Sequence, residues 1–149
     1  MKMRDKHSGI TIDVQILQQI REDAQNRYPS EACGMLLCEK EDPVITRIIP
    51  LENERKDVDR ITHFYADPIS IFRAEQTADA EGYKLLGFYH SHPEHEAVLS
   101  AEDEKYLIPG MICLILPVTE RAVGNGRAYR KETIAGKGME ITVRVMEKD

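Results

Sequence analysis

The sequence has no apolar stretch long enough to cross a lipid bilayer, and it has no basic run. Its longest apolar stretches, at residues 111–118 and 35–38, fall far short of the roughly 20 residues that a membrane-spanning helix needs. The 149 residues include 20 Lys and Arg against 26 Asp and Glu, which gives a net charge of -6 and no electrostatic footprint for binding phosphates. Neither a membrane nor a nucleic acid is therefore expected as a partner.

The sequence also shows no secretory signal and no cysteine framework. Its charged beginning, MKMRDKHSG, has no apolar stretch of the kind that directs export, so we expect a cytoplasmic protein in a reducing compartment. The cysteines Cys33, Cys38 and Cys113 are odd in number, and none belongs to a CxxC pair. This argues against both a disulfide framework and a zinc ribbon. Cys38 and Cys113 are expected to be buried free thiols.

Length and apolar patterning predict a single α/β domain over residues 1–149. A core of this size buries roughly two-thirds of the surface of the unfolded chain. Short apolar runs bounded by proline, glycine or charged residues predict strands at 9–12, 31–38, 44–49, 61–65, 85–90, 111–118, 127–131 and 141–146. The segment 52–60 is predicted to be a loop. Because strands and helices do not alternate strictly, we expect a mixed sheet flanked by helices.

Three helices are predicted from their start and stop signals. Asp13 is expected to cap the first, whose apolar residues follow helical spacing and which ends at Tyr28 and Pro29. Asp67 and Pro68 begin the second, and a short third helix covers 100–108 before Pro109 and Gly110. The expected apolar positions are Val14, Leu17, Ile20 and Ala24 in the first helix, and Ile69, Phe72, Ala80 and Tyr83 in the second.

Two histidines, His90 and His92, lie at the end of the predicted strand 85–90. Alternate side chains of a strand point to the same face, so both imidazoles can reach one metal ion. Pro93 cannot continue a central ladder, which places the pair at the rim of the sheet. A His-x-His pair by itself is weak grounds for a metal site, because surface histidines and hydrogen-bonded core histidines are more common.

An aspartate, Asp103, follows the histidines within the predicted short helix that Ser100 begins. One interpretation is a capping box between Ser100 and Asp103. The other is a metal ligand, because the helix N-terminus also favours the ionised carboxylate that a metal requires. Two imidazoles and one carboxylate leave a tetrahedral Zn²⁺ one open position, as in catalytic zinc sites.

A metal-dependent hydrolase needs a general base, and Glu31 lies where the apolar run 31–38 begins. A carboxyl group beside a dry core is expected to have a raised pKa, which suits that role. Taken alone, a glutamate at this position is more often an ordinary charge at the entrance of a strand, and only its combination with the other residues favours a general base.

Taken together, these residues resemble a known signature. The segments SEACGMLL (30–37) and HSHP (90–93), with Ser100 and Asp103, are similar to the motifs of the JAMM metalloprotease family, also called MPN-plus domains. The resemblance covers most of the chain, and every polar position of the signature is filled. It implies a mixed, curved sheet flanked by helices, similar to the cytidine deaminases. The cysteine pair of the deaminase motif is lacking, which argues against deaminase chemistry.

The resemblance implies that His90, His92 and Asp103 bind Zn²⁺, that Glu31 activates the attacking water, and that Ser100 stabilises the oxyanion. It further implies hydrolysis of the bond after the C-terminal Gly-Gly of a ubiquitin-like or sulfur carrier protein. Two alternatives stay open: a non-catalytic MPN-type module that binds such proteins, and a zinc amidohydrolase acting on a small substrate.

Further polar residues have open roles. His95 is expected to be an exposed loop residue, with a spare ligand or a substrate contact as the alternative. Asn53 is expected to serve a turn, or else to contact the substrate backbone. His63 and His7 are weaker candidates.

Overall fold

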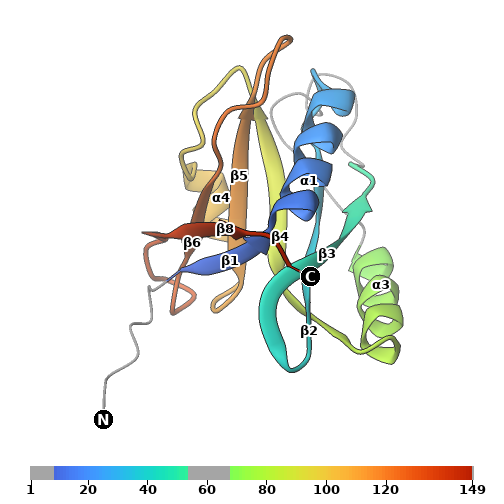
Figure 1. Ribbon diagram of the computed structural model, residues 1–149. Coiled ribbons are helices and arrows are strands. Elements are labelled where there is room, and N and C mark those ends of the chain that lie inside the picture. Colours follow the sequence, from blue (N-terminus) through green and yellow to red (C-terminus); the bar gives the residue numbers. More distant parts are fainter. Residues whose placement is uncertain (1–8, 54–67, 149) are drawn as a thin grey trace.

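The computed structural model describes residues 9–53 and 68–148, which form one curved sheet with helices on both of its faces (Figure 1). The elements, in chain order, are β1 (Ile10–Asp13), α1 (Val14–Arg27), β2 (Cys33–Glu39), β3 (Asp42–Leu51), α3 (Pro68–Ala80), β4 (Tyr83–Pro93), α4 (Ala101–Tyr106), β5 (Ile112–Val118), β6 (Arg127–Arg130), β7 (Met139–Ile141) and β8 (Val143–Met146). The predicted strand 61–65, most of the loop 52–60 and Asp67 lie outside the described residues.

The sheet is mixed, as predicted. Its strand order is β7-β6-β5-β4-β2-β3-β1-β8, with β1 parallel to β3 and β8, and β4 parallel to β5. The other neighbouring pairs are antiparallel. The terminal strands β7 and β8 are separated in sequence only by Thr142, whose carbonyl accepts a hydrogen bond from Ile10 N at 2.8 Å. The two edge strands of the sheet are therefore consecutive in the chain. The sheet must curl for one short segment to supply both of them.

The apolar core is divided by the central strands, because alternate residues of a strand face opposite sides. In β2, Leu36 packs in the cluster that includes Ile20 and Ala24 of α1. Met35 and Leu37 pack on the other side with Ala78 of α3. Such burial on both faces explains why residues 33–38 are continuously apolar.

The predicted apolar stripe of the second helix is wrong. Ile69 and Phe72 are both 59 % exposed, Ala80 is exposed, and Tyr83 belongs to β4. The face that packs on the sheet instead carries Ile71, Ala74 and Ala78. Two apolar faces were available in this helix, and tertiary packing rather than periodicity selects between them.

Asp13 is the N-cap residue of α1, as predicted, but its side chain makes no capping hydrogen bond. Its Oδ1 accepts a hydrogen bond from the backbone N–H of Lys148 at 2.9 Å, which ties the end of β8 to the start of α1. Long-range pairing has thus taken the place of the local cap.

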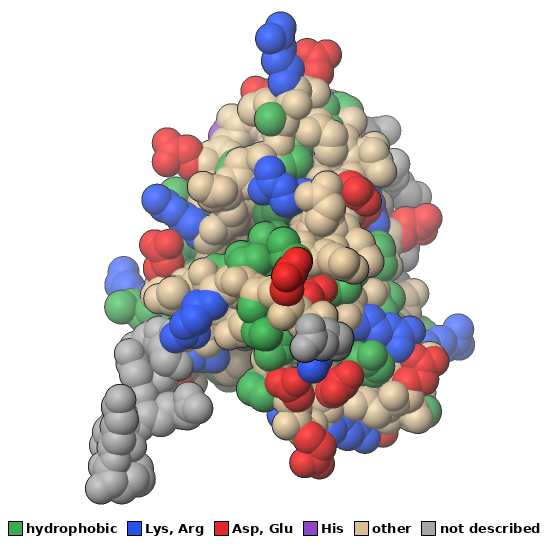
Figure 2. Space-filling model, viewed as in Figure 1, with side chains coloured by type: hydrophobic (Ala, Val, Ile, Leu, Met, Phe, Trp, Pro, Cys, Tyr) green, Lys and Arg blue, Asp and Glu red, His purple; other side chains and the backbone are tan. Residues whose placement is uncertain are grey.

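Two other features concern the surface and the thiols. Cys33, Cys38 and Cys113 are free and buried, which confirms the prediction for Cys38 and Cys113. On the face shown in Figure 2, Lys and Arg side chains are interspersed with Asp and Glu. No helix among the described residues has both the length and the apolarity to cross a membrane.

Candidate metal centre

His90 and His92 lie at the end of β4, where one of its two neighbouring strands has stopped. Pairing with β2 runs as far as Cys33 opposite His90, whereas pairing with β5 continues to Pro93 opposite Val118. The strand ends at Pro93, as predicted. The two imidazoles therefore project from a backbone held firmly on one side while the other side opens to the rim of the sheet.

The side chains of His90, His92 and Asp103 converge on one point. His90 Nε2 lies 3.2 Å from His92 Nε2, His92 Nε2 lies 3.1 Å from Asp103 Oδ2, and His90 Nε2 lies 3.4 Å from the same oxygen. Among the described residues, these three form a group of ligand atoms that could hold a metal ion.

The spacing of these atoms suits a tetrahedral ion. Zinc bonds of roughly 2.0–2.1 Å at tetrahedral angles place two ligand atoms roughly 3.3 Å apart. The three separations of 3.2, 3.1 and 3.4 Å bracket this value. Two imidazoles and a carboxylate also match the nitrogen and oxygen donors that zinc accepts, so the residues present fit a zinc ion with one coordination position left open.

The outer nitrogens of both rings have partners that orient them. His92 Nδ1 lies 2.8 Å from the backbone carbonyl of Glu96, so Nδ1 carries the proton and donates it there. His90 Nδ1 lies 3.9 Å from the buried Cys113 Sγ. The hydrogen bond to Glu96 fixes the orientation of the His92 ring and leaves its Nε2 lone pair directed at the ligand group.

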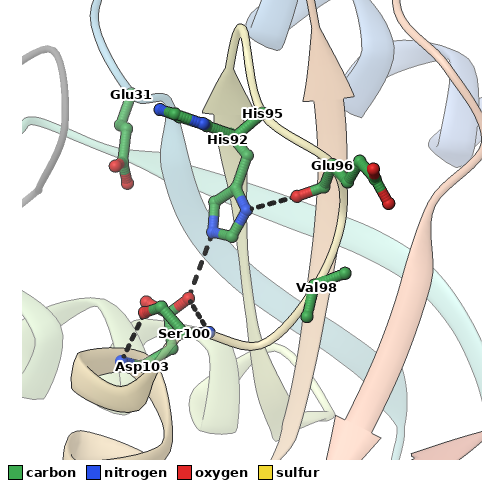
Figure 3. Close-up of a pocket in the computed structure, with 7 residues that line it drawn as sticks. All are labelled: Glu31, His92, His95, Glu96, Val98, Ser100 and Asp103. Atoms are coloured by element: carbon green, nitrogen blue, oxygen red, sulfur yellow. Dashed lines mark hydrogen bonds and ion pairs between the residues drawn. The ribbon is translucent and has the colours of Figure 1, made fainter.

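Asp103 serves as a capping residue and a member of the ligand group at the same time. Its backbone N–H donates to Ser100 Oγ at 2.9 Å, and its Oδ2 accepts from the Ser100 N–H at 3.1 Å, which completes a capping box on α4. The two interpretations left open by the sequence therefore coexist. The cap sets the orientation of the carboxylate, which faces the His92 imidazole in Figure 3.

Charge within the group favours the protonation state that a metal needs at Asp103. Burial alone would raise the pKa of Asp103, but hydrogen bonds from His90 and His92 outweigh it and hold the pKa well below its usual range. Burial alone would lower the pKa of His92, but hydrogen bonds with Asp103 and the Glu96 carbonyl give a net rise. Asp103 therefore stays ionised, and His92 retains its proton to a higher pH than an ordinary histidine.

Metal affinity is expected to fall as the pH decreases from about 8 to about 5.5, because protons compete with the metal for imidazole nitrogen. Because the pKa of His92 is raised, protons compete with the metal for this imidazole at a higher pH than for an ordinary histidine. The lowered pKa of Asp103 keeps its carboxylate unprotonated over the same pH range. The measurement is zinc affinity by chelator competition at a series of pH values, with a slope of up to about tenfold per pH unit for each proton released. An affinity independent of pH would contradict this electrostatic account.

Glu31 lines the same pocket as His92 and Asp103, and Figure 3 shows its carboxylate pointing into it. Glu31 is only 4 % exposed and lies just before β2, next to the fully buried Ala32. Two contacts hold this backbone: Asn53 Nδ2 donates to the Glu31 carbonyl at 3.1 Å, and Ala32 N donates to Ser91 Oγ at 2.8 Å. The segments that carry the acid and the histidines are thereby joined directly.

The pocket has a volume of about 560 Å³. Its lining residues are Glu31, His92, His95, Glu96, Val98, Ser100 and Asp103. His95, Glu96, Val98 and Ser100 are exposed, so they form its outer rim, while Glu31 lies deeper. An acid, a candidate metal group and a serine hydroxyl thus face one space that solvent and a ligand can enter.

The supporting roles of several residues were not predicted from the sequence. Asn53 bonds the Glu31 backbone, Cys113 contacts His90, and Tyr129 and Lys131 bond backbone carbonyls of the segment that carries Asp103. Each comes from an element distant in sequence from the group it supports, so no local spacing could reveal it. His63 and His7 lie outside the described residues.

The mixed curved sheet with a His-His-Asp group at its rim defines a candidate metalloprotein of the α/β class. Comparison with known families is more specific: the chain belongs to the family described as prokaryotic homologs of the JAB domain, which matches residues 13–131.

Two curated relatives and two solved structures are similar to the chain. Desampylase of Haloferax volcanii is 31% identical over 124 residues, or 80% of this chain and 88% of that protein. A probable TtuB-protein conjugate cleaving protease of Thermus thermophilus is 32% identical over 90 residues, or 60% of this chain and 57% of that protein. Protein DSY2949 of Desulfitobacterium hafniense has a TM-score of 0.78 at 25% identity, covering 93% of this chain and 94% of its own. AF2198 of Archaeoglobus fulgidus, a JAB1/MPN domain protein, has a TM-score of 0.60 at 22% identity, covering 93% and 99%.

Proposed function

We propose that this chain is a zinc-dependent isopeptidase of the JAMM class, with residues 1–149 acting as one peptidase domain. The observation that carries the proposal is the meeting of His90, His92 and Asp103 at tetrahedral spacing, with His92 and Asp103 lining the same pocket as Glu31. A zinc ion held there would supply a Lewis acid that polarises a carbonyl group and makes water easier to deprotonate.

Glu31 is the general base of this proposal. Its carboxylate faces the pocket from the start of β2, opposite the side from which Asp103 enters (Figure 3). It accepts a proton from the attacking water and then delivers that proton to the departing amine, so proton transfer balances over the cycle. Its buried position and the bond from Asn53 to its carbonyl keep the carboxylate in place between these steps.

Ser100 is the proposed hydrogen-bond donor to the oxyanion. Its Oγ already accepts the Asp103 N–H, and a hydroxyl group that accepts one bond still has its own proton to donate. The capping bond therefore fixes the oxygen while the O–H remains free to turn toward the pocket. A donor held in this way stabilises negative charge that develops on the scissile carbonyl.

The proposed substrate is a conjugate of a ubiquitin-like or sulfur carrier protein, cleaved after its C-terminal Gly-Gly. Two relatives support this class of substrate, since one is named a desampylase and the other a conjugate-cleaving protease. The exposed rim formed by His95, Glu96 and Val98 leaves the pocket accessible to a protein substrate. A diglycine tail has no side chains to clash with that rim. In an extended conformation it can enter the pocket that Glu31 lines.

The test uses a ubiquitin-like protein joined through Gly-Gly to a lysine side chain, and a matched conjugate whose last two residues are valine. We expect the zinc-loaded chain to cleave the first conjugate after the second glycine and to leave the second intact, with mass spectrometry locating the cut. Cleavage of neither conjugate by the zinc-loaded chain would overturn the proposal. Equal cleavage of both would overturn the diglycine preference.

A further inference from the structure

The helix that carries Asp103 has unusually little apolar support. It spans six residues, Ala101–Tyr106, and none of them is buried. Leu99 and Leu107, on either side of it, are only partly buried against a neighbouring cluster. Apolar packing therefore anchors the ends of this segment but does not fix the position of the helical turn itself.

Two buried polar side chains from β6 and the residue after it contact this segment. Tyr129 Oη donates to the backbone carbonyl of Ala97 at 2.7 Å. Lys131 Nζ donates to the carbonyls of Glu104 at 2.7 Å and Ile134 at 2.9 Å. Lys131 is only 2 % exposed, which is rare for a lysine. The two residues are two positions apart in extended chain, so both side chains point to the same side of the sheet.

The carbonyl groups of the segment that accept these bonds lie on either side of Ser100 and Asp103. Ala97 precedes Ser100, and Glu104 directly follows Asp103. A positive charge at the carbonyl end of a helix also complements the helix dipole, and Lys131 adds a second donor to the Glu104 carbonyl, which accepts the C-cap N–H of Leu107 at 3.4 Å. The Glu104 carboxylate is held in addition by the Gly138 N–H at 2.7 Å.

We propose that Tyr129 and Lys131 are positioning residues for the metal centre, which act by fixing the segment that presents Ser100 and Asp103 to the histidines. This inference rests on the proposed function, because it assumes that Asp103 binds zinc. The backbone of His90 and His92 is held separately, by the β4–β5 pairing. Without the brace, the Asp103 carboxylate is free to move while the backbone that carries the two imidazoles stays in place.

Lys131→Met is expected to weaken zinc binding by about 10- to 100-fold, the range seen when outer partners of metal ligands are lost. Methionine keeps the length of the apolar stem and removes the three N–H donors. Tyr129→Phe removes one hydroxyl group and is expected to weaken binding by about three- to tenfold, as for the loss of one neutral hydrogen bond. Chelator competition measures both effects, and circular dichroism of the metal-free proteins verifies the fold.

Matched controls are available in the same region. Lys137 and Tyr106 are exposed, and neither side chain bonds the segment backbone in the described residues, so Lys137→Met and Tyr106→Phe should retain the zinc affinity of the original protein. Zinc affinity in Lys131→Met and Tyr129→Phe equal to that of these controls would overturn the inference. Because Tyr129→Phe is a minimal change, it keeps the test decisive if Lys131→Met fails to fold.

A double-mutant cycle separates positioning from a general structural role. In an Asp103→Ala background, Lys131→Met should cause no further loss of zinc affinity, since the ligand that it positions is gone. An undiminished loss in that background would contradict positioning. The proposed function fails separately, by the absence of zinc binding in the unmodified chain. Tight zinc binding by the unmodified chain, together with equal zinc affinity in Lys131→Met, would overturn the positioning role and leave the proposed function standing.

Discussion

Replacement of Glu31 by glutamine is expected to lower kcat for conjugate cleavage by about 10²- to 10⁴-fold, the usual contribution of a general base. Glutamine has nearly the same shape but cannot accept the proton of the attacking water. The residue lies in the pocket but is not a member of the His-His-Asp group, so bound zinc should be unchanged. Steady-state kinetics and metal analysis on the same samples measure the two quantities.

Glu96→Gln provides the matched control for this experiment. Glu96 lines the same pocket, but it contributes its backbone carbonyl to the metal centre and its side chain is exposed. Its substitution should therefore change kcat less than about tenfold, because glutamine keeps the backbone carbonyl and substitutions of exposed side chains usually have small effects. Equal turnover by Glu31→Gln and the original protein would remove the proposed role of Glu31.

Replacement of His92 by alanine is expected to abolish both zinc retention and cleavage. His92 Nε2 lies 3.2 Å from His90 Nε2 and 3.1 Å from Asp103 Oδ2, so its loss leaves a two-ligand site. Loss of a direct ligand should weaken binding by more than about 100-fold, since loss of an outer partner alone costs 10- to 100-fold. Metal analysis after gel filtration and the conjugate-cleavage assay provide the readouts.

His95→Ala is the control, because His95 lines the pocket at its exposed rim and lies outside the ligand group. Its zinc content should equal that of the original protein. Full zinc occupancy and activity in His92→Ala would exclude this histidine as a ligand. Loss of zinc in His95→Ala but not in His92→Ala would indicate that a different set of side chains binds the metal.

The central part of the fold could be predicted from sequence because it depends on short apolar runs. The predicted strands 31–38, 85–90 and 111–118 correspond to β2, β4 and β5, which are paired side by side in the sheet. Their residues are buried by neighbours on both sides, so composition alone marks them. The predicted mixed sheet with flanking helices is confirmed.

The parts that were predicted less well depend on tertiary contacts. The predicted strand 141–146 is divided at Thr142, where the chain passes from one end of the sheet to the other. The predicted helix 100–108 is limited to Ala101–Tyr106, with Leu107 as its C-cap. At Thr142 the boundary coincides with the long-range hydrogen bond from Ile10 N, whereas the helix ends at an extended Leu107 shortly before Pro109. Helix ends commonly differ by one or two residues from such an expectation.

The candidate site divides along similar lines. His90, His92 and Asp103 could be selected because, together with Glu31 and Ser100, they resemble the JAMM signature, and the structure brings the three of them together. The groups that orient them include backbone carbonyls, such as that of Glu96, which any residue type would supply. Support of this kind leaves no trace in the sequence, and it becomes visible only once the chain is folded. The catalytic roles of Glu31 and Ser100 and the cytoplasmic location stay predictions.

X-ray absorption at the zinc edge of the zinc-loaded protein tests the central claim most directly. We predict one zinc per chain, with two imidazole rings and only nitrogen or oxygen neighbours, at about 2.0–2.1 Å. Cys113 Sγ lies 3.9 Å from His90 Nδ1, the ring nitrogen that faces away from the ligand group, so no sulfur neighbour of the zinc is expected. A sulfur neighbour at about 2.3 Å, or the absence of imidazole scattering, would contradict the account.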